Sequence, residues 1–484
     1  MMYPTLVWFR NDLRLEDNPA FCAAVEQKGP ILPLYIHAPD EEGEWKPGEA
    51  SNWWLHHSLY ALHEELSKLG LRLIVQQGES LDILTRLAKK TKAAAIFWNR
   101  RYEPTLVARD AYVKSCLQEL DVFVESFNAS LLFEPWEIKN RQDKPFKVFT
   151  PFWKHYLSIM APPMPLARPQ TVLAPSSWPP SLSIGDLELQ PFYDWTGGLQ
   201  ENWKPGARHA KHQLERFINE TILHYDEKRN RPDTVGTSRL SPYLHFGDIG
   251  PRQVFHAVQE RLQEENNDAF AKNAWAFLRE LGWREFAYHL LFHFPYTADS
   301  PLREEFEAFP WQANPQGMEA WRKGLTGYPI VDAGMRELWE TGWMHNRVRM
   351  IVASFLVKDQ LLPWREGAKW FWNTLVDADL ANNTLGWQWT AGCGADAAPY
   401  FRIFNPVLQG EKFDPQGHYV RKWVPELAGL PNKLLHKPWE ASPTALAEAG
   451  IELGETYPRP IVDHKEARAD ALRAYDTIKK KKAN

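Results

Sequence analysis

The sequence is poor in cysteine and has no long apolar run. Its 484 residues include only three cysteines, Cys22, Cys116 and Cys393, and none belongs to a CxxC pair. Neither a disulfide framework nor a cysteine-based zinc site is therefore supported. No stretch approaches 18 uncharged apolar residues, so no transmembrane helix is expected. Charged residues stand near the N-terminus, where a signal peptide has an apolar segment, and the sequence predicts a cytoplasmic protein.

An excess of one charge sign is also missing. Lys and Arg number 56 against 61 Asp and Glu, which gives a formal net charge of −5. With 44% hydrophobic and 24% charged residues, the composition is that of an ordinary globular protein. It excludes a histone-like polycation and a disordered acidic chain. The length exceeds one ordinary hydrophobic core, so we expect two domains or one large one.

The first 130 residues alternate short apolar runs with helical patterns. The runs that indicate buried strands lie at 5–9, 31–36, 71–75, 94–98 and 122–124. Helical patterns lie between them, for example at 53–69 and 106–120. This alternation predicts an α/β domain over residues 1–130 with a doubly wound parallel sheet, which binds ligands beyond the carboxyl ends of its strands. GxGxxG and P-loop motifs are absent, so we expect no dinucleotide or P-loop phosphate site here.

The remainder of the chain changes character twice. Nine prolines between 162 and 205 predict an extended linker laid over the surface, which we place at 131–206. Residues 207–475 show helical spacing, as in 271–293 and 348–362, and predict a mostly α-helical second domain. Residues 476–484 form a basic tail that is either solvated or a nucleic-acid-binding patch.

Two helix faces of the second domain carry groups that suit a ligand. Glu280, Trp283 and Arg284 are spaced i, i+3 and i+4 and share one face, and Asn346 and Met350 share another. Such faces suit a flat, partly polar ligand such as a nucleobase. From these residues alone, a helix–helix interface with a paired carboxylate fits equally well. His289 and His293 have no third ligand nearby in sequence, so we expect no catalytic metal.

Two shorter segments carry hydroxyl and acidic groups. The run GTSRLSP at 236–242 suits an anion cradle, although a plain helix N-cap explains it as well. Asp377 and Asp379 lie just before GWQW and need cationic or hydrogen-bonding partners if they are buried. Arg349 or Arg284 could supply one.

Tryptophan is the residue type in clear excess. The chain has 23, and 11 of them lie between Trp275 and Trp389. Packing explains part of this number, since tryptophan is the bulkiest side chain. The clustering calls for a second reason.

Taken together, these motifs resemble the photolyase and cryptochrome family. The motifs that carry the resemblance are WFRNDLRLEDN at 8–18, GTSRLSP at 236–242, WREF at 283–286, TGYPIVDAGMR at 326–336, WMHNRVRM at 343–350, DADLANN at 377–383, GWQW at 386–389 and RIFNPVLQGEKFD at 402–414. The resemblance extends from residue 3 to about residue 470. Within the family, the chain looks like a bacterial class III cyclobutane pyrimidine dimer photolyase.

The resemblance implies that the helical domain binds FAD. The positions that match the family's cofactor-binding residues are Tyr225, Thr237, Ser238, Arg239, Leu240, Ser241, Phe277, Arg284, Arg349, Asp377, Ala378 and Asp379. Asn383 aligns with the residue that faces flavin N5. Trp387, Trp364 and Trp311 align with the chain of indoles that reduces resting flavin under light.

The resemblance also implies a substrate and a reaction. Members of the family split pyrimidine dimers in UV-damaged DNA by electron transfer from excited reduced FAD, after the dimer has been flipped out of the duplex. Glu280 would hydrogen-bond the thymine carbonyls. The residues expected to pack around the bases are Trp283, Trp389, Asn346 and Met350, and those expected to contact DNA near the lesion are Arg229, Arg347 and Gln409.

Particular positions separate the branches of the family. A (6-4) photolyase would have histidines at the positions of Asn346 and Met350, and plant-type cryptochromes usually have Asp at 383 and Tyr at 389. The residues here favour the repair enzyme, a deoxyribodipyrimidine photo-lyase acting as a monomer. The alternative is a cryptochrome-like blue-light photoreceptor with little repair activity.

The light-harvesting antenna is less well marked. The Asn-Glu pair with which class I members bind folate is replaced by Thr105 and Leu106. The start of the helix at Trp53 and Trp54 and the loop 99–103 resemble class III members that bind 5,10-methenyltetrahydrofolate. We therefore expect this folate as the antenna, in preference to a deazaflavin.

Overall fold

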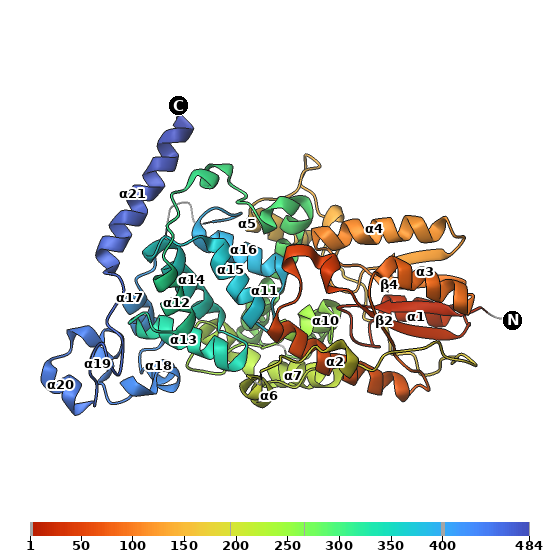
Figure 1. The fold of residues 1–484 in the computed structure, drawn as a ribbon, viewed down its shortest axis with the longest axis horizontal. Helices are drawn as coiled ribbons and strands as arrows, with labels where there is room; N and C mark the ends of the chain where they lie inside the picture. Colours follow the sequence, from red (N-terminus) through yellow and green to blue (C-terminus); the bar gives the residue numbers. More distant parts are fainter. Residues whose placement is uncertain (1–2, 194, 266, 398–401, 484) are drawn as a thin grey trace.

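The computed structural model describes residues 3–193, 195–265, 267–397 and 402–483, with the side chains of 480–483 left out. Figure 1 shows the α/β domain with the N-terminus at one end of an elongated molecule and the helices of the second domain filling the rest. The C-terminal helix α21 projects from the far end (Figure 1). In the described part of the chain, no helix combines the length and the apolarity that a bilayer crossing requires.

The N-terminal domain is built on one parallel sheet of five strands. The strands are β1 (Thr5–Phe9), β2 (Ile31–His37), β3 (Ile74–Gln77), β4 (Ala95–Asn99) and β5 (Phe123–Phe127). Their order is β3-β2-β1-β4-β5, and every pairing is parallel. The doubly wound α/β prediction is confirmed. The third strand begins at Ile74 rather than at Leu71, because only Ile74–Gln77 pair with β2.

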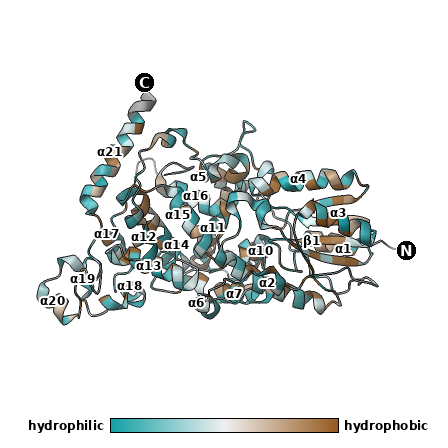
Figure 2. Cartoon of the chain, in the orientation of Figure 1, coloured by the Kyte–Doolittle hydropathy of each residue, from teal (hydrophilic) through white to brown (hydrophobic). Residues whose placement is uncertain are grey.

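Helices cover both faces of this sheet. They are α1 (Pro19–Glu26), α2 (Glu49–Ser67), α3 (Ser80–Thr91) and α4 (Pro104–Gln118). Successive strand residues point to opposite faces, so Val7 and Phe9 pack with α1 and α2, whereas Leu6 and Trp8 pack with α3 and α4. Figure 2 shows β1 in the hydrophobic colours, and all five of its residues are buried, as expected for a central strand covered on both faces.

The segment 131–206 follows the sheet domain, but it is not extended throughout. Near its middle it pairs with the sheet, where the N–H of Ile31 donates to the Leu173 carbonyl (2.9 Å) and that of Leu182 to the Val75 carbonyl (3.0 Å). It also forms two helices, α5 (Phe149–Ser158) and α6 (Gly197–Asn202). α5 buries Phe149 and packs against α11 (Asp268–His293). This tertiary contact, which the proline-rich composition does not reveal, stabilises the helix.

The second domain consists of helices joined by loops and short 3-10 turns. Besides α11, the helices are α7 (Ala207–Asn219), α8 (Tyr225–Lys228), α9 (Ser241–His245), α10 (Pro251–Glu264), α12 (Pro315–Lys323), α13 (Pro329–Thr341), α14 (Asn346–Ser354), α15 (Trp364–Thr374), α16 (Leu380–Ala391), α17 (Pro406–Phe413), α18 (His418–Trp423), α19 (Asn432–Leu435), α20 (Pro443–Glu448) and α21 (His464–Ala483). The mostly α-helical prediction is confirmed.

Two helical predictions need correction. The apolar pattern at 348–362 is not one α-helix, because α14 gives way to a π-helical turn at Phe355–Asp359 and the chain then turns at Leu361, where φ is +54°. The predicted basic tail at 476–484 is not separate as far as the structure describes it: residues 476–483 continue α21, and Ile478 is buried against the domain.

The two domains share a buried interface along α2. Trp54 packs against Trp203 (ring centroids 5.5 Å apart) and Tyr243 (4.9 Å) of the helical domain. Its indole N–H donates to Asp248 Oδ2 at 2.9 Å, and Ser58 Oγ lies 3.1 Å from the same oxygen. The interface therefore carries a carboxyl group without water around it.

Replacing Asp248 should change how stability depends on pH. Burial raises the pKa of Asp248 to about 7. Because the folded state holds this proton more tightly than the unfolded state, the group's contribution to stability falls as pH rises from about 4 to about 7. Asp248→Asn removes that loss. We expect the unfolding free energy of the variant, relative to the parent, to rise by about 2 kcal/mol between pH 5 and pH 8 in urea titrations. If the difference in unfolding free energy between variant and parent is the same at pH 5 and pH 8, Asp248 does not titrate in this range.

Candidate flavin and DNA-lesion site

Three predicted flavin-site residues lie on one face of α16. Asp379 is the N-cap residue of this helix, where its Oδ1 accepts from the N–H of Asn382 (2.9 Å). Asn383 and Trp387 follow at intervals of four residues and share that face. The Asn383 amide donates to the Ala368 carbonyl at 3.0 Å, so its side-chain oxygen is the atom left for a ligand. Trp387 is buried, and its indole N–H has no hydrogen-bond partner in the described part of the chain.

The structure decides how the two acidic residues before α16 are paired. Asp377 accepts two hydrogen bonds from Arg349 Nη2, at 3.0 and 2.9 Å, and Arg349 Nε also donates to the Met344 carbonyl. Asp379 instead accepts from the Tyr288 hydroxyl and lies 3.4 Å from His245 Nδ1. Both carboxylates are therefore held in place by polar partners, which leaves their positions rigid.

Arg284 supplies the buried positive charge next to Asp379. Its guanidinium lies 4.8 Å from the Tyr288 ring centroid and donates to the Ser130 carbonyl at 2.7 Å. Burial alone would raise the pKa of Asp379, but the hydrogen bond from His245 and the charges of His245 and Arg284 outweigh it and hold the pKa well below its ordinary value. Asp379 is thus ionised within a polar cluster that faces the centre of the domain.

The loop at 236–242 divides its residues between packing and the surface. The side chain of Leu240 is buried, and the Arg239 guanidinium lies between the indoles of Trp203 (4.5 Å) and Trp343 (4.7 Å). Arg239 itself adopts φ +52°, a left-handed conformation that turns the chain into α9. The hydroxyl-bearing Thr237, Ser238 and Ser241 remain at least partly exposed. The side chains of Leu240 and Arg239 therefore serve packing, whereas the hydroxyl groups remain available to a ligand.

Two aromatic residues close one end of this region. The rings of Tyr225 and Phe277 lie 5.5 Å apart, edge to face, with Phe217 packed behind Phe277 at 4.5 Å. Phe277 precedes Arg284 by two turns of α11, so both point to the same side of that helix. Ala378, between the two aspartates, is buried.

The residues predicted to hold the DNA lesion stand on three neighbouring helices. α16, which carries Trp389, packs against both α11 and α14. Trp283 of α11 stacks on Phe149 of α5 with ring centroids 3.6 Å apart and an interplanar angle of 8°. Asn346 is exposed and Met350 is half-buried on α14. Sequence reasoning missed the contribution of Phe149, which supports Trp283 from behind, because it belongs to the segment expected to be a linker.

Arginine side chains gather at the edge of this lesion region. Arg229 Nη1 forms an ion pair with Glu280 Oε1 at 2.7 Å. Burial, and after it the like charges of Arg229 and Arg402, lower the pKa of Arg347. Arg402 was not singled out from the sequence, although it opens the RIFNP motif. This concentration of positive charge fits phosphate groups.

The third DNA-contact candidate, Gln409, lies beside the same cluster. It stands on α17, one turn before Phe413, whose ring lies 4.5 Å from the Arg347 guanidinium. Arg347 also donates to Asn230 Oδ1 at 2.7 Å. α17 thus brings Gln409 to the side of the arginine cluster.

The three tryptophans predicted to carry electrons form a series from the interior to the surface. Trp387 is buried against Gly367 of α15, and Trp364, also buried, begins that helix one turn earlier. Trp311 is only half-buried, and the neighbouring Gln312 N–H donates to the Leu361 carbonyl just before α15 (2.9 Å). The series therefore passes from α16 over α15 to the loop at 309–312.

Gly367 is the contact that lets α15 and α16 approach. A Cβ atom there would lie 2.0 Å from the Trp387 ring, whereas a Cβ at Gly386 would meet nothing within 4 Å. Gly367→Ala should lower the unfolding free energy by about 1–3 kcal/mol, because the indole must move in a packed core. The matched Gly386→Ala should be neutral or stabilise by up to about 1 kcal/mol. Urea unfolding compares the two, and equal effects would contradict the close approach.

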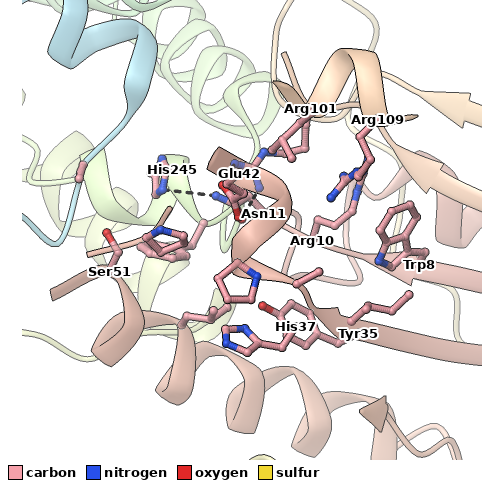
Figure 3. Close-up of a pocket in the computed structure, with 18 of the residues that line it drawn as sticks. Trp8, Arg10, Asn11, Tyr35, His37, Glu42, Ser51, Arg101, Arg109 and His245 are labelled. Carbon is pink, nitrogen blue, oxygen red and sulfur yellow. Dashed lines mark hydrogen bonds and ion pairs between the residues drawn. The ribbon is translucent and has the colours of Figure 1, made fainter. Parts of the chain in front are cut away.

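A second crevice lies at the carboxyl ends of β1 and β2. Figure 3 shows side chains of both strands and of the helical domain converging on it. Its cavity volume is about 50 Å³, and it is partly open to solvent. Arg10 and Arg109 lie 4.6 and 4.9 Å from the Trp8 ring, and Asn11 Nδ2 lies 3.3 Å from His245 Nε2. This is the position at which doubly wound sheets bind ligands, beside the switch in strand order between β1 and β4.

Only some of the residues predicted for the antenna site line this crevice. Trp53 and Trp54 are core residues rather than walls of the crevice, since both are buried at the domain interface and α2 begins at Glu49. The loop 99–103 and the position after Thr105 do contribute, through Arg101 and Leu106. His245 and Ala378 also line the crevice, so it shares a wall with the Asp379 cluster.

Comparisons with known proteins identify the class to which this architecture belongs. Residues 277–477 match the family model described as the FAD binding domain of DNA photolyase, and residues 5–170 match the model described as DNA photolyase. The chain belongs to the DNA photolyase and cryptochrome family. The family prediction and the prediction of an FAD-binding helical domain are confirmed.

Individual relatives extend over the whole chain. The chain is 48% identical over 478 residues to a deoxyribodipyrimidine photo-lyase of Agrobacterium fabrum, covering 99% of this chain and 98% of that protein. It is 44% identical to Cryptochrome-1 of Arabidopsis thaliana, covering 96% of this chain and 69% of that protein. The crystal structure of a bacterial class III photolyase from Agrobacterium tumefaciens superposes with a TM-score of 0.95 at 47% identity, covering 99% of this chain and 98% of that one.

Proposed function

We propose that this protein is a deoxyribodipyrimidine photo-lyase that repairs cyclobutane pyrimidine dimers in UV-damaged DNA under light, acting as a monomer. The observation that carries the proposal is the assembly of Glu280, Trp283, Asn346, Met350 and Trp389 on neighbouring helices, beside the α16 face with Asn383 and Trp387. One chain contributes all of these residues. The photo-lyases among its relatives support the assignment.

The residues of the helical domain fit FAD. When bound, reduced FAD supplies the light-driven electron for dimer splitting. Asn383 presents an acceptor oxygen, because its amide N–H is used by Ala368, and such an oxygen suits the protonated N5 of a reduced flavin. Arg284 places positive charge near the Asp379 carboxylate, and Thr237, Ser238 and Ser241 offer hydroxyls for a pyrophosphate and ribose. The buried Trp387 lies one turn from Asn383, where an electron donor to resting flavin is required.

The lesion residues have separate tasks. A dimer inside a duplex is out of reach, so it must be flipped out, and Trp283 and Trp389 offer aromatic faces to its bases. Glu280 offers hydrogen bonds to the thymine edges. Arg229, Arg347 and Gln409 stand where the flanking backbone would pass, and their contacts hold the strand without reading its sequence.

The crevice at the sheet edge is the proposed antenna site, with 5,10-methenyltetrahydrofolate as the occupant. The guanidinium groups of Arg10, Arg101 and Arg109 line the crevice and would attract the carboxylates of a folate, in competition with the acidic side chains that pair with them here. The wall shared through His245 keeps antenna and flavin sites close together. The absorption spectrum of the purified protein tests this assignment: a near-ultraviolet band supports folate, and a blue band supports a deazaflavin.

Repair itself is tested with a defined substrate. The reduced, FAD-loaded protein is illuminated with an oligonucleotide that carries one thymine dimer, and recovery of thymine absorbance is followed against a dark control. Recovery with this substrate, and none with the same oligonucleotide carrying a (6-4) photoproduct, supports the proposal. A flavin that responds to light while the dimer persists would contradict it and favour a cryptochrome-like photoreceptor.

A further inference from the structure

The carboxylate proposed to hold the lesion is already occupied in this structure. Glu280 Oε1 lies 2.7 Å from Arg229 Nη1, across the gap between α11 and the residue that ends α8. The two side chains are 29% and 25% exposed, so water reaches the pair only in part. Glu280 lies one turn before Trp283 on α11, so the pair is close to the residue proposed to pack against the lesion.

The surroundings of the pair are unevenly charged. The neighbouring Arg347 donates to the amide of Asn230 and lies against Phe413. Within the described residues, neither Arg347 nor Arg402 has a carboxylate at ion-pair distance, so Glu280 is the only anion bound directly to this group of three arginines. Burial opposes the charge of Arg229, but the Glu280 carboxylate outweighs it and raises the pKa of the guanidinium. The group therefore has room for a further anion, and DNA carries one at every nucleotide.

We propose that the Arg229–Glu280 ion pair is a latch that damaged DNA opens: a backbone phosphate takes over Arg229, and the released Glu280 carboxyl turns to the edge of the flipped base. This inference rests on the proposed function. A single carboxylate cannot satisfy a guanidinium and a base edge at full strength, and a phosphate can replace it because it fits the same guanidinium fork. The latch thus couples backbone binding to recognition of the base.

The latch also makes Arg229 a specificity-determining residue. Undamaged DNA offers phosphates but no flipped base, so opening the pair would leave Glu280 without a partner, which is unfavourable at a partly buried site. A flipped dimer provides that partner. Opening is therefore favourable only when a lesion is present, and contact with intact duplex leaves the pair closed.

A double-mutant cycle on lesion binding tests the latch. The parent, Arg229→Gln, Glu280→Gln and the double variant are prepared as full-length, FAD-loaded proteins, and their Kd values are measured in the dark for a thymine-dimer oligonucleotide. When Glu280 is present, Arg229→Gln has two opposing effects on binding: a phosphate contact is lost, but the cost of breaking the ion pair disappears. When Glu280 is replaced by Gln, no ion pair exists, so only the loss of the phosphate contact remains. We therefore expect Arg229→Gln to weaken binding by a factor roughly three to ten times larger in the Glu280→Gln background.

Two controls make the cycle specific. Arg347→Gln, at an arginine without a carboxylate partner, should weaken dimer binding by the same factor in both backgrounds. For undamaged oligonucleotide, Arg229→Gln should leave binding by the Glu280 parent unchanged, because the latch stays closed, and should weaken binding only in the Glu280→Gln background, where Arg229 is free to bind a phosphate. The same four variants, unfolded in urea without DNA, should show a favourable Arg229–Glu280 coupling, which reports that the pair exists in solution.

The outcomes separate the latch from the proposed function. The latch is overturned if Arg229→Gln weakens binding of dimer DNA by the same factor in both backgrounds, or by a larger factor when Glu280 is present. It is also overturned if urea unfolding shows no coupling between Arg229 and Glu280. A parent protein that neither prefers the dimer nor repairs it overturns the proposed function instead. Flavin absorbance and the urea midpoint show whether each variant is folded before its Kd is used.

Discussion

Trp387→Phe is expected to abolish light-driven reduction of the oxidised flavin while leaving repair by chemically reduced protein intact. Trp387 is buried, lies one turn from Asn383 on the same face of α16, and contacts α15 at Gly367. Phenylalanine fits the space but is far harder to oxidise than tryptophan, so the first step of the proposed series is lost. The reduction is followed by flavin absorbance under blue light with an external electron donor.

A matched variant on the same helix controls this experiment. Trp389 lies two residues further along α16, where it lines a small cavity with Lys358 and Arg402. Trp389→Phe should therefore reduce its flavin at the parent rate, although it binds the dimer less well. Reduction of Trp387→Phe at the parent rate would show that electrons enter by a path that does not use this indole.

Asp379→Asn should both destabilise the protein and weaken its hold on FAD. The carboxylate is buried and accepts from Tyr288, lies 3.4 Å from His245 and is close to Arg284. Removing one member of a buried charge cluster costs about 3–5 kcal/mol, because the remaining charge is left uncompensated. Asparagine still caps α16, so Asp379→Ala should cost about 1 kcal/mol more. Urea unfolding and flavin retention on gel filtration measure both effects.

The pH dependence of Asp379 follows from the direction of its shift. A carboxyl whose pKa is lowered on folding stabilises the protein above its ordinary pKa of 3.8, and this contribution is lost as pH falls below that value. The parent should therefore lose stability on acidification more steeply than Asp379→Asn. An acid titration with equal slopes for the two proteins would contradict the ionised cluster.

Local patterns predicted the elements and the family well, but not which distant residues meet. The spacing of Glu280, Trp283 and Arg284 predicted a shared helix face, yet an internal interface and a ligand pocket fitted equally well. The structure shows the internal contacts of this face: Arg284 is buried with Tyr288, and Trp283 stacks on Phe149 from a different segment. Such stacking depends on how α5 packs on α11, and no local pattern encodes that.

The pairing of acidic and basic residues shows the same division. Asp377 and Asp379 needed cationic partners by composition, and both Arg349 and Arg284 were candidates. Only the packed helices bring Arg349 to Asp377 and leave Asp379 with Tyr288 and His245. The antenna crevice is a further example, since Trp53 and Trp54 were expected near it and are instead core residues of the domain interface.

The sequence by itself determined the parallel α/β domain, the helical second domain and membership of the photolyase and cryptochrome family, because strand and helix periodicity and short motifs are local properties. Only the tertiary structure decided the Arg229–Glu280 ion pair, the like charges that surround Arg347, and the position of His245 between the crevice and Asp379. These features join residues that lie far apart along the chain. Their distances are set by packing of whole elements, so spacing in the sequence carries no record of them.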